Sequence, residues 1–157
     1  MFRLSRMTDY GIVLMTHLAE SERGSVHNAR EVAAETQVPH PVVSKLLKSL
    51  AREGLLVSQR GARGGYSLAR APEEISVAEL IAVLDGPIGL TECSAHPGQC
   101  AQEPSCHVRE PWQRINGVVR AALARVTLAD HARPGFPGAL FGQLAFAPAA
   151  LREPGVE

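Results

Sequence analysis

The fold is decided by residues 40–69, which read HPVVSKLLKSLAREGLLVSQRGARGGYSLA. The first part of this stretch has the period of a helix with two separate faces. The apolar face holds Val43, Leu46, Leu47 and Leu50, and the opposite face holds Pro41, Ser44, Lys45, Lys48 and Arg52. The spacing therefore predicts an amphipathic helix from about His40 to Glu53, with one buried face and one polar, basic face.

Two runs after this helix have the composition of short β-strands, residues 55–59 (LLVSQ) and residues 66–69 (YSLA). The tip between them, residues 60–65 (RGARGG), combines three glycines with two arginines. Glycine allows close backbone approach, and arginine presents a fixed fork of donors that fits phosphates or a narrow minor groove. The stretch therefore predicts the recognition helix and wing of a winged helix, and a plain hairpin with solvated arginines is the alternative.

Two shorter helical patterns precede the recognition helix. Apolar residues at helical spacing predict a first helix from about Ser5 to Glu20, and Asn28 with Glu31 forms a capping box for a second helix over residues 29–36. A turn at residues 37–39 follows. A short helix, a tight turn and a second helix make a helix-turn-helix, whose second helix enters the major groove of DNA. A surface helix with solvated lysines is the alternative.

The charge of the chain is unevenly distributed, although its 157 residues have a formal net charge of zero. Residues 1–70 hold ten Lys and Arg against six Asp and Glu, whereas residues 71–157 hold six against ten. The basic first half predicts contact with an anionic partner such as nucleic acid, and an ordinary solvated surface is the alternative. The apolar fraction of 45% supports a folded core, and no apolar run is long enough to span a membrane.

A capping box at Ser76 and Glu79 predicts a fourth helix that ends at Gly86. A longer helix is predicted over residues 111–132. Its apolar residues recur at spacings of three and four, as in a heptad seam: Trp112, Ile115, Val119, Ala122 and Val126. Because a winged helix already has its own core, the seam predicts a dimerisation helix and a homodimer, with packing onto its own domain as the alternative.

The sequence thus divides into four parts. A winged helix-turn-helix DNA-binding domain is predicted for residues 1–86, a cysteine-containing loop for 87–110 and a dimerisation helix for 111–132. Residues 133–157 are rich in Pro, Gly and Ala and are predicted to be a flexible tail, with weak docking through Phe136, Phe141 and Phe146 as the alternative. The expected fold class is mainly α with a small β-hairpin wing.

The three cysteines of the chain, Cys93, Cys100 and Cys106, lie within fourteen residues, and His107 follows the last. Such clustering is typical of a metal or iron-sulfur site, and chance placement of buried cysteines is the alternative. The odd count and the absence of a signal-peptide pattern predict a reducing cytoplasm, where disulfides are rare. A nucleophilic pair of Cys106 and His107 would need an orienting group that the sequence does not offer, so an enzyme is not expected.

Several of these motifs together resemble the Rrf2 family of bacterial winged-helix regulators, the IscR and NsrR type. The resemblance spans about residues 1–128 and is carried by residues 3–10 (RLSRMTDY), 38–39 (VP), 54–58 (GLLVS), 60–69 (RGARGGYSLA) and the three cysteines. Within the family, the opening and the recognition helix are most similar to the branch that regulates the SUF iron-sulfur assembly operon.

The resemblance implies that Cys93, Cys100 and Cys106 ligate an iron-sulfur cluster. The family's ligand histidine would fall at Arg109, so the fourth ligand is open between His107 and Asp9, which matches an aspartate that NsrR-type members contribute from the other protomer. The first cysteine gap is also one residue longer than in the IscR type. A solvated loop histidine and a helix N-terminal charge are the respective alternatives. Solvent, Glu92 or His96 remain further candidates for the fourth ligand. A histidine ligand favours [2Fe-2S], and an aspartate is compatible with [4Fe-4S].

The expected DNA contacts follow from the two basic elements. We expect base contacts from the start of the recognition helix, phosphate contacts from its basic residues, and minor-groove contacts from the wing. The residues concerned are, in that order, His40, Pro41, Val42 and Ser44; Lys45, Lys48 and Arg52; and Arg60, Gly61 and Arg63.

The function expected from these features and from the resemblance is a cytoplasmic, homodimeric, cluster-sensing transcriptional regulator that represses a SUF operon. The cluster is expected to fix the relative orientation of the two winged helices. Two alternatives keep the same fold: a regulator that responds to redox state or nitric oxide, and a DNA-binding protein whose cysteines hold a structural zinc ion.

Overall fold

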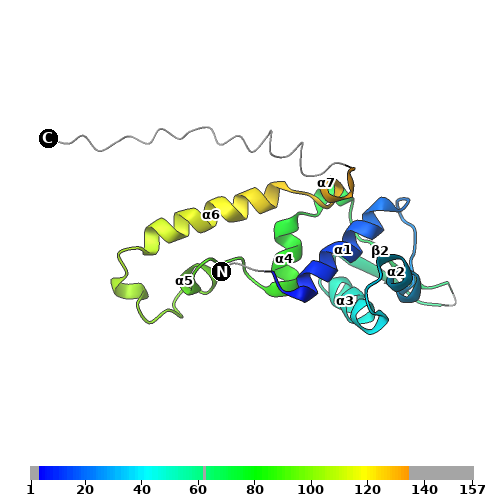
Figure 1. Cartoon of the computed structure of the whole chain (residues 1–157), viewed down its shortest axis with the longest axis horizontal. Coiled ribbons are helices and arrows are strands. Elements are labelled where there is room, and N and C mark those ends of the chain that lie inside the picture. The colour runs from blue at the N-terminus through cyan, green and yellow to red at the C-terminus, as the bar shows by residue number, and fades with distance from the viewer. Residues whose placement is uncertain (1–3, 62, 135–157) are drawn as a thin grey trace.

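The computed structural model describes residues 4–61 and 63–134. Its elements are α1 (Arg6–Glu20), α2 (Ala29–Thr36), α3 (His40–Arg52), β1 (Leu56–Gln59), β2 (Gly65–Leu68), η1 (Pro72–Glu74), α4 (Val77–Asp85), α5 (Glu92–Ala95), η2 (Glu103–Ser105), α6 (Arg109–Arg125) and α7 (Leu128–Ala132). In Figure 1, α1 to α4 and the hairpin form one group, the chain then runs away through α5, and α6 brings it back to α7. The expected fold class, mainly α with a two-stranded hairpin, is confirmed.

The predicted helix-turn-helix is confirmed in α2 and α3. The Asn28 side chain accepts hydrogen bonds from the backbone N–H groups of Arg30 and Glu31, and the Glu31 carboxylate accepts the Asn28 N–H in return at 3.2 Å. Gln37 then adopts a left-handed conformation with φ of 58°, which ends α2, and Pro39 precedes α3. Local capping and turn chemistry therefore account for the boundaries of both helices.

The predicted wing is an antiparallel hairpin in which Leu56 pairs with Leu68 and Gln59 with Gly65. A third segment joins it, because the N–H groups of His27 and Tyr66 each donate to the other's carbonyl at 2.9 Å. This pairing explains Gly65, since a Cβ atom there would lie 2.4 Å from the His27 carbonyl oxygen. The linker between α1 and α2 thereby fixes the end of β2 next to the wing tip.

One large cluster of buried apolar residues forms the core of the winged helix. Its fully buried members include Leu14 and Met15 of α1, Leu47 of α3, Leu80 of α4 and Leu128 of α7. Burial of each large side chain contributes about 1.5–3 kcal/mol, so this cluster is the main source of stability. Because Leu128 belongs to it, α7 is part of the winged helix, although 42 residues separate α4 and α7 in the sequence.

The helix predicted over residues 111–132 is wrong in its length, because two helices occupy this stretch. Thr127 interrupts it by capping α7: its hydroxyl accepts the Asp130 N–H at 3.2 Å, and the Asp130 carboxylate accepts the Thr127 N–H at 2.9 Å. The flanking backbone pairs with the winged helix instead, since the Val77 N–H donates to the Val126 carbonyl and the Leu128 N–H to the Ile75 carbonyl, both at 2.8 Å. A single long dimerisation helix is not evident.

The seam predicted on that helix also divides in two. Val126 is buried in a second, smaller cluster with Val77, Ile81 and Ile88, and Val119 packs against the same cluster. Trp112 and Ile115, in contrast, are 40% and 47% exposed. One edge of the apolar stripe on α6 packs on α4. The other edge, with Trp112 and Ile115, is not covered by the described residues of the chain.

The start of α1 is tied to the end of α4 by Asp85, whose carboxylate accepts the Ser5 N–H at 2.9 Å. Burial of Asp85 opposes its ionisation, but its hydrogen bonds with Ser5 and Thr8 outweigh burial and lower its pKa. The predicted fourth helix is confirmed as α4, with Ser76 accepting the Glu79 N–H and Gly86 ending the helix at a φ of 89°.

No helix in residues 4–61 and 63–134 is long and apolar enough to cross a membrane. The tail predicted for residues 133–157, with its three phenylalanines, lies outside the described residues except for its first two positions.

Candidate functional site

The outer face of α3 carries exposed basic side chains. Lys45, Lys48 and Arg52 are exposed, while the opposite face, with Val43 and Leu47, is buried in the core. Within the described part of the chain, none of the three basic side chains lies within 4.0 Å of a carboxylate. Their charges are therefore available to an anionic partner.

The N-terminal end of α3 places its residues in different environments. His40 and Pro41 are exposed, and Ser44 is half-buried with its Oγ 3.4 Å from His40 Nε2. Val42, in contrast, packs partly against the core cluster. His40, Pro41 and Ser44 therefore face outward at this end of α3. Val42 faces outward the least, because it packs partly against the core.

The wing tip needs its glycines. Gly61 has a φ of 114°, and its carbonyl accepts the Gly64 N–H at 2.9 Å, which closes the turn. A Cβ atom on Gly64 would lie 2.4 Å from the Gln59 carbonyl oxygen. Arg60, just before this turn, and Arg63, inside it, are both exposed, so the tight backbone holds two guanidinium groups at the tip.

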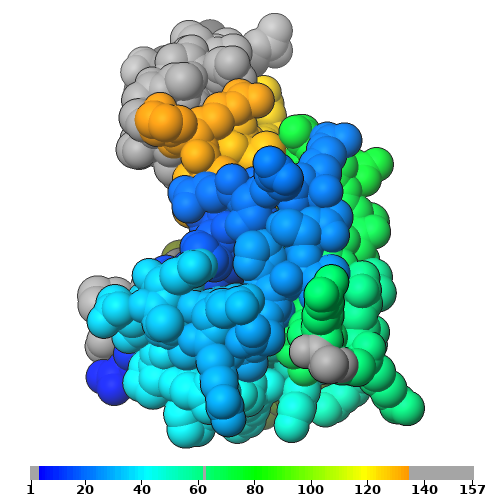
Figure 2. Space-filling view, turned by 90° about the vertical axis from the view of Figure 1, so that its right-hand side faces the viewer, coloured from blue at the N-terminus to red at the C-terminus, as the bar shows by residue number. Residues whose placement is uncertain are grey.

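A groove of about 600 Å³ lies between the start of α2, the start of α3 and the wing. Its lining includes Asn28, Arg30, His40, Arg63 and Gly64. Figure 2 looks at this end of the molecule, where α2 and α3 (blue to cyan) lie beside the hairpin. Arg30 is exposed and was missed in the sequence; its position two residues after the helix cap Asn28 is the signal that could have found it.

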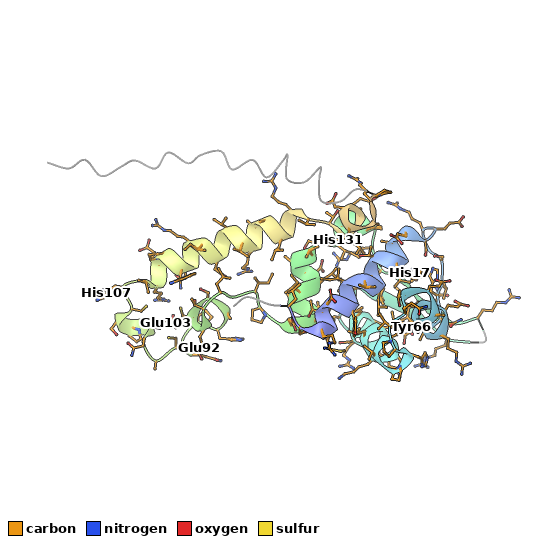
Figure 3. The ribbon with its side chains drawn as sticks, in the orientation of Figure 1. His17, Tyr66, Glu92, Glu103, His107 and His131 are labelled. Carbon is orange, nitrogen blue, oxygen red and sulfur yellow. The ribbon has the colours of Figure 1, made fainter. Side chains whose placement is uncertain are left out.

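The segment between α4 and α6, residues 87–108, carries all three cysteines and is called here the cysteine segment. Cys93 lies on α5 and is buried, with its Sγ 3.3 Å from the Thr91 hydroxyl, whereas Cys100 and Cys106 are half-buried. All three thiols are free. Figure 3 shows His107 and Glu103 of this segment at the end of the molecule opposite the wing.

The donor chemistry of the cysteine segment fits an iron-sulfur cluster, because three free thiols lie within fourteen residues. The arrangement in one chain does not complete such a site. Among the described residues, no group of three or more His, Cys, Asp or Glu side chains is placed so that it could hold a metal ion. The exposed Asp9 of α1 and the exposed His107 are thus not gathered with the thiols in the single chain.

Two buried polar side chains hold the cysteine segment in place. Glu103 is 8% exposed; its carboxylate accepts the Gly98 N–H at 2.7 Å and pairs with the Arg109 guanidinium at 2.8 Å. Asn116 of α6 is 4% exposed; it accepts the Leu90 N–H at 3.0 Å and donates to the Ile88 carbonyl at 3.1 Å. Neither residue was singled out in the sequence. The partners of Asn116 are 26 and 28 residues away, and the partners of Glu103, although near in the sequence, lie in a loop without a periodic pattern.

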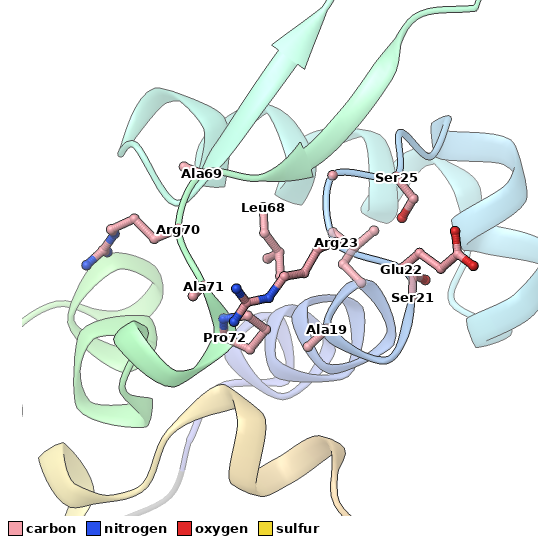
Figure 4. Close-up of a pocket in the computed structure, with 12 residues that line it drawn as sticks. Ala19, Ser21, Glu22, Arg23, Ser25, Leu68, Ala69, Arg70, Ala71 and Pro72 are labelled. Carbon is pink, nitrogen blue, oxygen red and sulfur yellow. The ribbon is translucent and has the colours of Figure 1, made fainter.

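A separate hollow of about 210 Å³ lies between the end of α1 and the base of the wing (Figure 4). Arg23 lines it and pairs with Glu73 at 3.1 Å. This volume is below the range of about 300–1,000 Å³ typical of small-molecule sites. The hollow therefore does not compete with the basic face as the functional site.

A helix-turn-helix with an unpaired basic recognition helix and a two-stranded wing defines the class of winged-helix transcriptional regulators. Residues 4–134 match the pattern of one family in this class, Rrf2, described as an iron-dependent transcriptional regulator. The chain belongs to the Rrf2 family.

Its relatives include well-matched sequences and solved structures. The chain is 30% identical to the regulator CymR of Bacillus subtilis, over 83% of this chain and 89% of CymR, and 28% identical to the regulator NsrR of Shouchella clausii, over 78% of each. The structure of CymR, the global cysteine regulator of B. subtilis, matches with a TM-score of 0.66 at 31% identity, covering 84% of this chain and 97% of CymR.

A structure of IscR from T. potens matches with a TM-score of 0.63 at 27% identity, over 83% of this chain and 85% of IscR. These relatives are transcriptional regulators, so the chain is a regulator and not an enzyme. The resemblance to the IscR and NsrR type is supported at the level of the family. CymR is a relative of similar standing.

Proposed function

We propose that this chain is a cytoplasmic, DNA-binding transcriptional regulator that senses iron-sulfur cluster supply through its cysteine segment. DNA binding is supported by the unpaired basic face of α3 and the arginine-bearing wing on either side of one groove. In this proposal α3 lies in a major groove of the operator, and the wing tip reaches the adjacent minor groove.

The contacts of this interface follow from the exposure of its side chains. His40, Pro41 and Ser44 face base edges, with Val42 beside them, and Lys45, Lys48 and Arg52 face phosphates. Arg60, Gly61 and Arg63 form the minor-groove contact, and Arg30 adds a phosphate contact from the first turn of α2.

Homodimer formation is part of the proposal because α6 leaves apolar side chains uncovered. Val108, Trp112, Ile115 and Val118 are between 40% and 55% exposed and lie at helical spacing on one edge of α6. A second copy of the chain would cover this edge, and two winged helices would then reach successive major grooves about 34 Å apart. In this proposal the winged helix, the cysteine segment and α6 have the roles expected from the sequence, with α7 added to the winged helix.

The observation that carries the sensing part is the placement of three free thiols on the one segment that joins the winged helix to α6. Cys93, Cys100 and Cys106 would hold the cluster, which supplies a redox-sensitive and oxidant-sensitive link among the thiolates when bound. The fourth ligand in this proposal is either His107 or Asp9 of the partner subunit, both of which are exposed. The regulated target, from the resemblance, is a SUF iron-sulfur assembly operon that the protein represses.

Anaerobic purification followed by a visible spectrum, with iron and acid-labile sulfide counted per chain, tests this proposal. Brown protein with matched iron and sulfide is expected, and Cys106→Ala should lose both. Asp9→Asn and His107→Asn then assign the fourth ligand, because only loss of the true ligand changes the spectrum. Colourless protein that holds zinc, or no metal, would contradict cluster sensing and leave the DNA-binding proposal standing.

A second candidate function is direct thiol-based redox sensing by the same fold. It is favoured by the backbone of Glu103, which bonds to the backbone of both Cys100 and Cys106 and so keeps two free thiols on one closed stretch. Two half-buried thiols, Cys100 and Cys106, would form a disulfide as an oxidant accepts two electrons and two protons leave. Metal-free protein whose DNA affinity changes reversibly with dithiothreitol would favour this candidate.

A further inference from the structure

Glu103 and Asn116 are two of the four polar residues buried in the described part of the chain, and the other two, Thr8 and Ser67, lie in the winged helix. Burying a polar side chain is unfavourable unless its hydrogen bonds are made. Glu103 and Asn116 make theirs with the backbone of the cysteine segment and with Arg109. The buried polar contacts of this half of the molecule are thus concentrated on the segment that carries the thiols.

Glu103 ties together the part of the segment that holds Cys100 and Cys106. Its N–H donates to the Cys100 carbonyl at 3.0 Å, and its carbonyl accepts the Cys106 N–H at 3.4 Å. Its carboxylate reaches Gly98 on one side and Arg109 on the other. One side chain therefore closes the stretch 98–109 around two of the thiols.

Asn116 holds the other part of the segment, which carries Cys93. It bonds the backbone of Ile88 and Leu90 and so fixes the turn that precedes α5 against α6. Gly89, inside this turn, has no room for a side chain, since a Cβ atom there would lie 2.4 Å from the Cβ of Ala95 on α5. The turn, α5 and Cys93 are thereby packed as one unit.

We propose that Glu103 and Asn116 are positioning residues for the thiols, and that they divide the cysteine segment into two pre-folded parts. Asn116 places Cys93, and Glu103 with Arg109 places Cys100 and Cys106; the metal-binding purpose of this arrangement rests on the proposed function. Arg109 stands where the resembled family has a ligand histidine, and in this chain it is the ion-pair partner of Glu103.

The benefit of this arrangement is a lower ordering cost. A free loop must lose backbone and side-chain entropy when its thiols bind a common ligand. With two pre-folded parts, only the placement of one part relative to the other has to change. In the single chain, no metal site is formed among the described residues. The segment can nevertheless bind a metal or cluster tightly, because little additional ordering is needed.

Alkylation of the reduced, metal-free, full-length protein tests the positioning. The rate of iodoacetamide modification would be measured at each cysteine by mass spectrometry. Both partners of the Glu103 carboxylate, the Gly98 N–H and the Arg109 guanidinium, are hydrogen-bond donors. Glu103→Gln replaces one acceptor oxygen by an NH₂ group, which cannot accept, so one of the two hydrogen bonds is lost. Because loss of a charge-assisted hydrogen bond shifts a local opening equilibrium by about tenfold, rates at Cys100 and Cys106 should rise by up to that factor, with Cys93 unchanged.

Asn116→Ala should give the opposite pattern, with faster modification of the buried Cys93 and unchanged rates at Cys100 and Cys106. The matched control is Glu110→Gln, which removes a carboxylate of the exposed pair with Arg114 and should change none of the three rates. Equal acceleration of all three thiols in both variants, or no change in either, would overturn the division into two parts.

Anaerobic Co²⁺ titration, followed by thiolate absorption, tests the link to metal binding. Supporting groups of a metal site typically contribute 10–100-fold to affinity, so Glu103→Gln and Asn116→Ala should each weaken Co²⁺ binding by about that factor, and Glu110→Gln should not. Wild-type protein that does bind Co²⁺, but no more tightly than the two variants, would overturn the inference. Failure of the proposed function is seen separately, as wild-type protein that retains no iron or sulfide and binds no Co²⁺.

Discussion

The winged helix and the cysteine segment are held together by different kinds of contact. The winged-helix core contains fourteen buried apolar residues drawn from α1 to α4, the hairpin, α7 and the short segments that connect them. The cysteine segment buries three residues, Ile88, Cys93 and Glu103, and depends on the hydrogen bonds of Glu103 and Asn116. Large apolar clusters unfold cooperatively, whereas segments with few buried contacts open locally at a lower free energy. The winged helix is therefore expected to keep one conformation, and the cysteine segment is expected to open locally.

This difference teaches where a signal could act. A ligand that joins the thiols has little apolar packing to disrupt in the cysteine segment, and α6, which follows it, packs on α4 at the edge of the winged helix. A conformational change in the cysteine segment can thus be transmitted to α6 without unfolding of the winged helix. Four substitutions would break or sharpen this comparison.

The largest effect is expected for Leu128→Ala. Leu128 is fully buried in the winged-helix core although it lies on α7, beyond the cysteine segment. Truncation of a buried leucine typically costs about 2–5 kcal/mol, so the urea midpoint should fall strongly in the global unfolding transition. Val13→Ala, at an exposed position of α1, is the control and should leave the midpoint nearly unchanged. Similar effects of both would mean that α7 is not part of the core.

The next effect is expected for Trp112→Ala, which tests the open edge of α6. An aromatic anchor at the centre of an interface commonly contributes about 2 kcal/mol, so the dimer dissociation constant should rise about thirtyfold in sedimentation equilibrium. The unfolding midpoint of the isolated chain should change little, because Trp112 is 40% exposed. Gln113→Ala, on the exposed surface beside it, is the control. An unchanged dimer would place the interface elsewhere.

A smaller effect is expected for Arg52→Ala on α3. Loss of one phosphate contact should reduce the slope of log affinity against log salt by about one and weaken operator and random DNA alike. Fluorescence anisotropy across a salt series measures both quantities. Arg114→Ala, which removes an exposed arginine of α6, should change neither. A loss confined to the operator would instead assign Arg52 to base recognition.

The smallest effect concerns pH. Burial lowers the pKa of His131 below its usual value of 6.5, and Asp130 opposes this only in part. The unfolded chain therefore takes up the proton first, so the stability contributed by neutral His131 is present above about pH 6.5 and is lost as pH falls below it. The difference in unfolding free energy between pH 7.5 and 5.5 should be smaller in His131→Gln than in the wild type. An equal difference in both proteins would contradict this contribution.

The hairpin and the first four helices could be predicted because their signals are local. Apolar spacing, the caps Asn28 and Ser76, and the glycines of the wing tip act over a few residues, and the boundaries match the structure closely. The basic candidates for DNA contact could be named for the same reason, since helical periodicity places Lys45, Lys48 and Arg52 on one face. Arg30 was missed because its relevance depends on the groove that three elements form together.

The C-terminal third was harder to predict, because its signals compete. A heptad-like spacing continued through Val126, and the capping pair Thr127 and Asp130 that ends it was overlooked. Val119 and Val126 satisfied the pattern of an intermolecular seam but pack within the chain. Periodicity reports that a face is apolar, and it does not report what covers that face.

The sequence by itself determined the helix-turn-helix, the wing and the grouping of three cysteines, because each is encoded by residues close together in the chain. Only the tertiary structure decided that α7 completes the winged-helix core and that one edge of α6 remains open. It also decided that Asn116 of α6 holds the start of the cysteine segment, 26 and 28 residues away. These features depend on contacts between distant residues, and such contacts form only when the whole chain balances buried apolar surface against the hydrogen bonds of its buried polar groups.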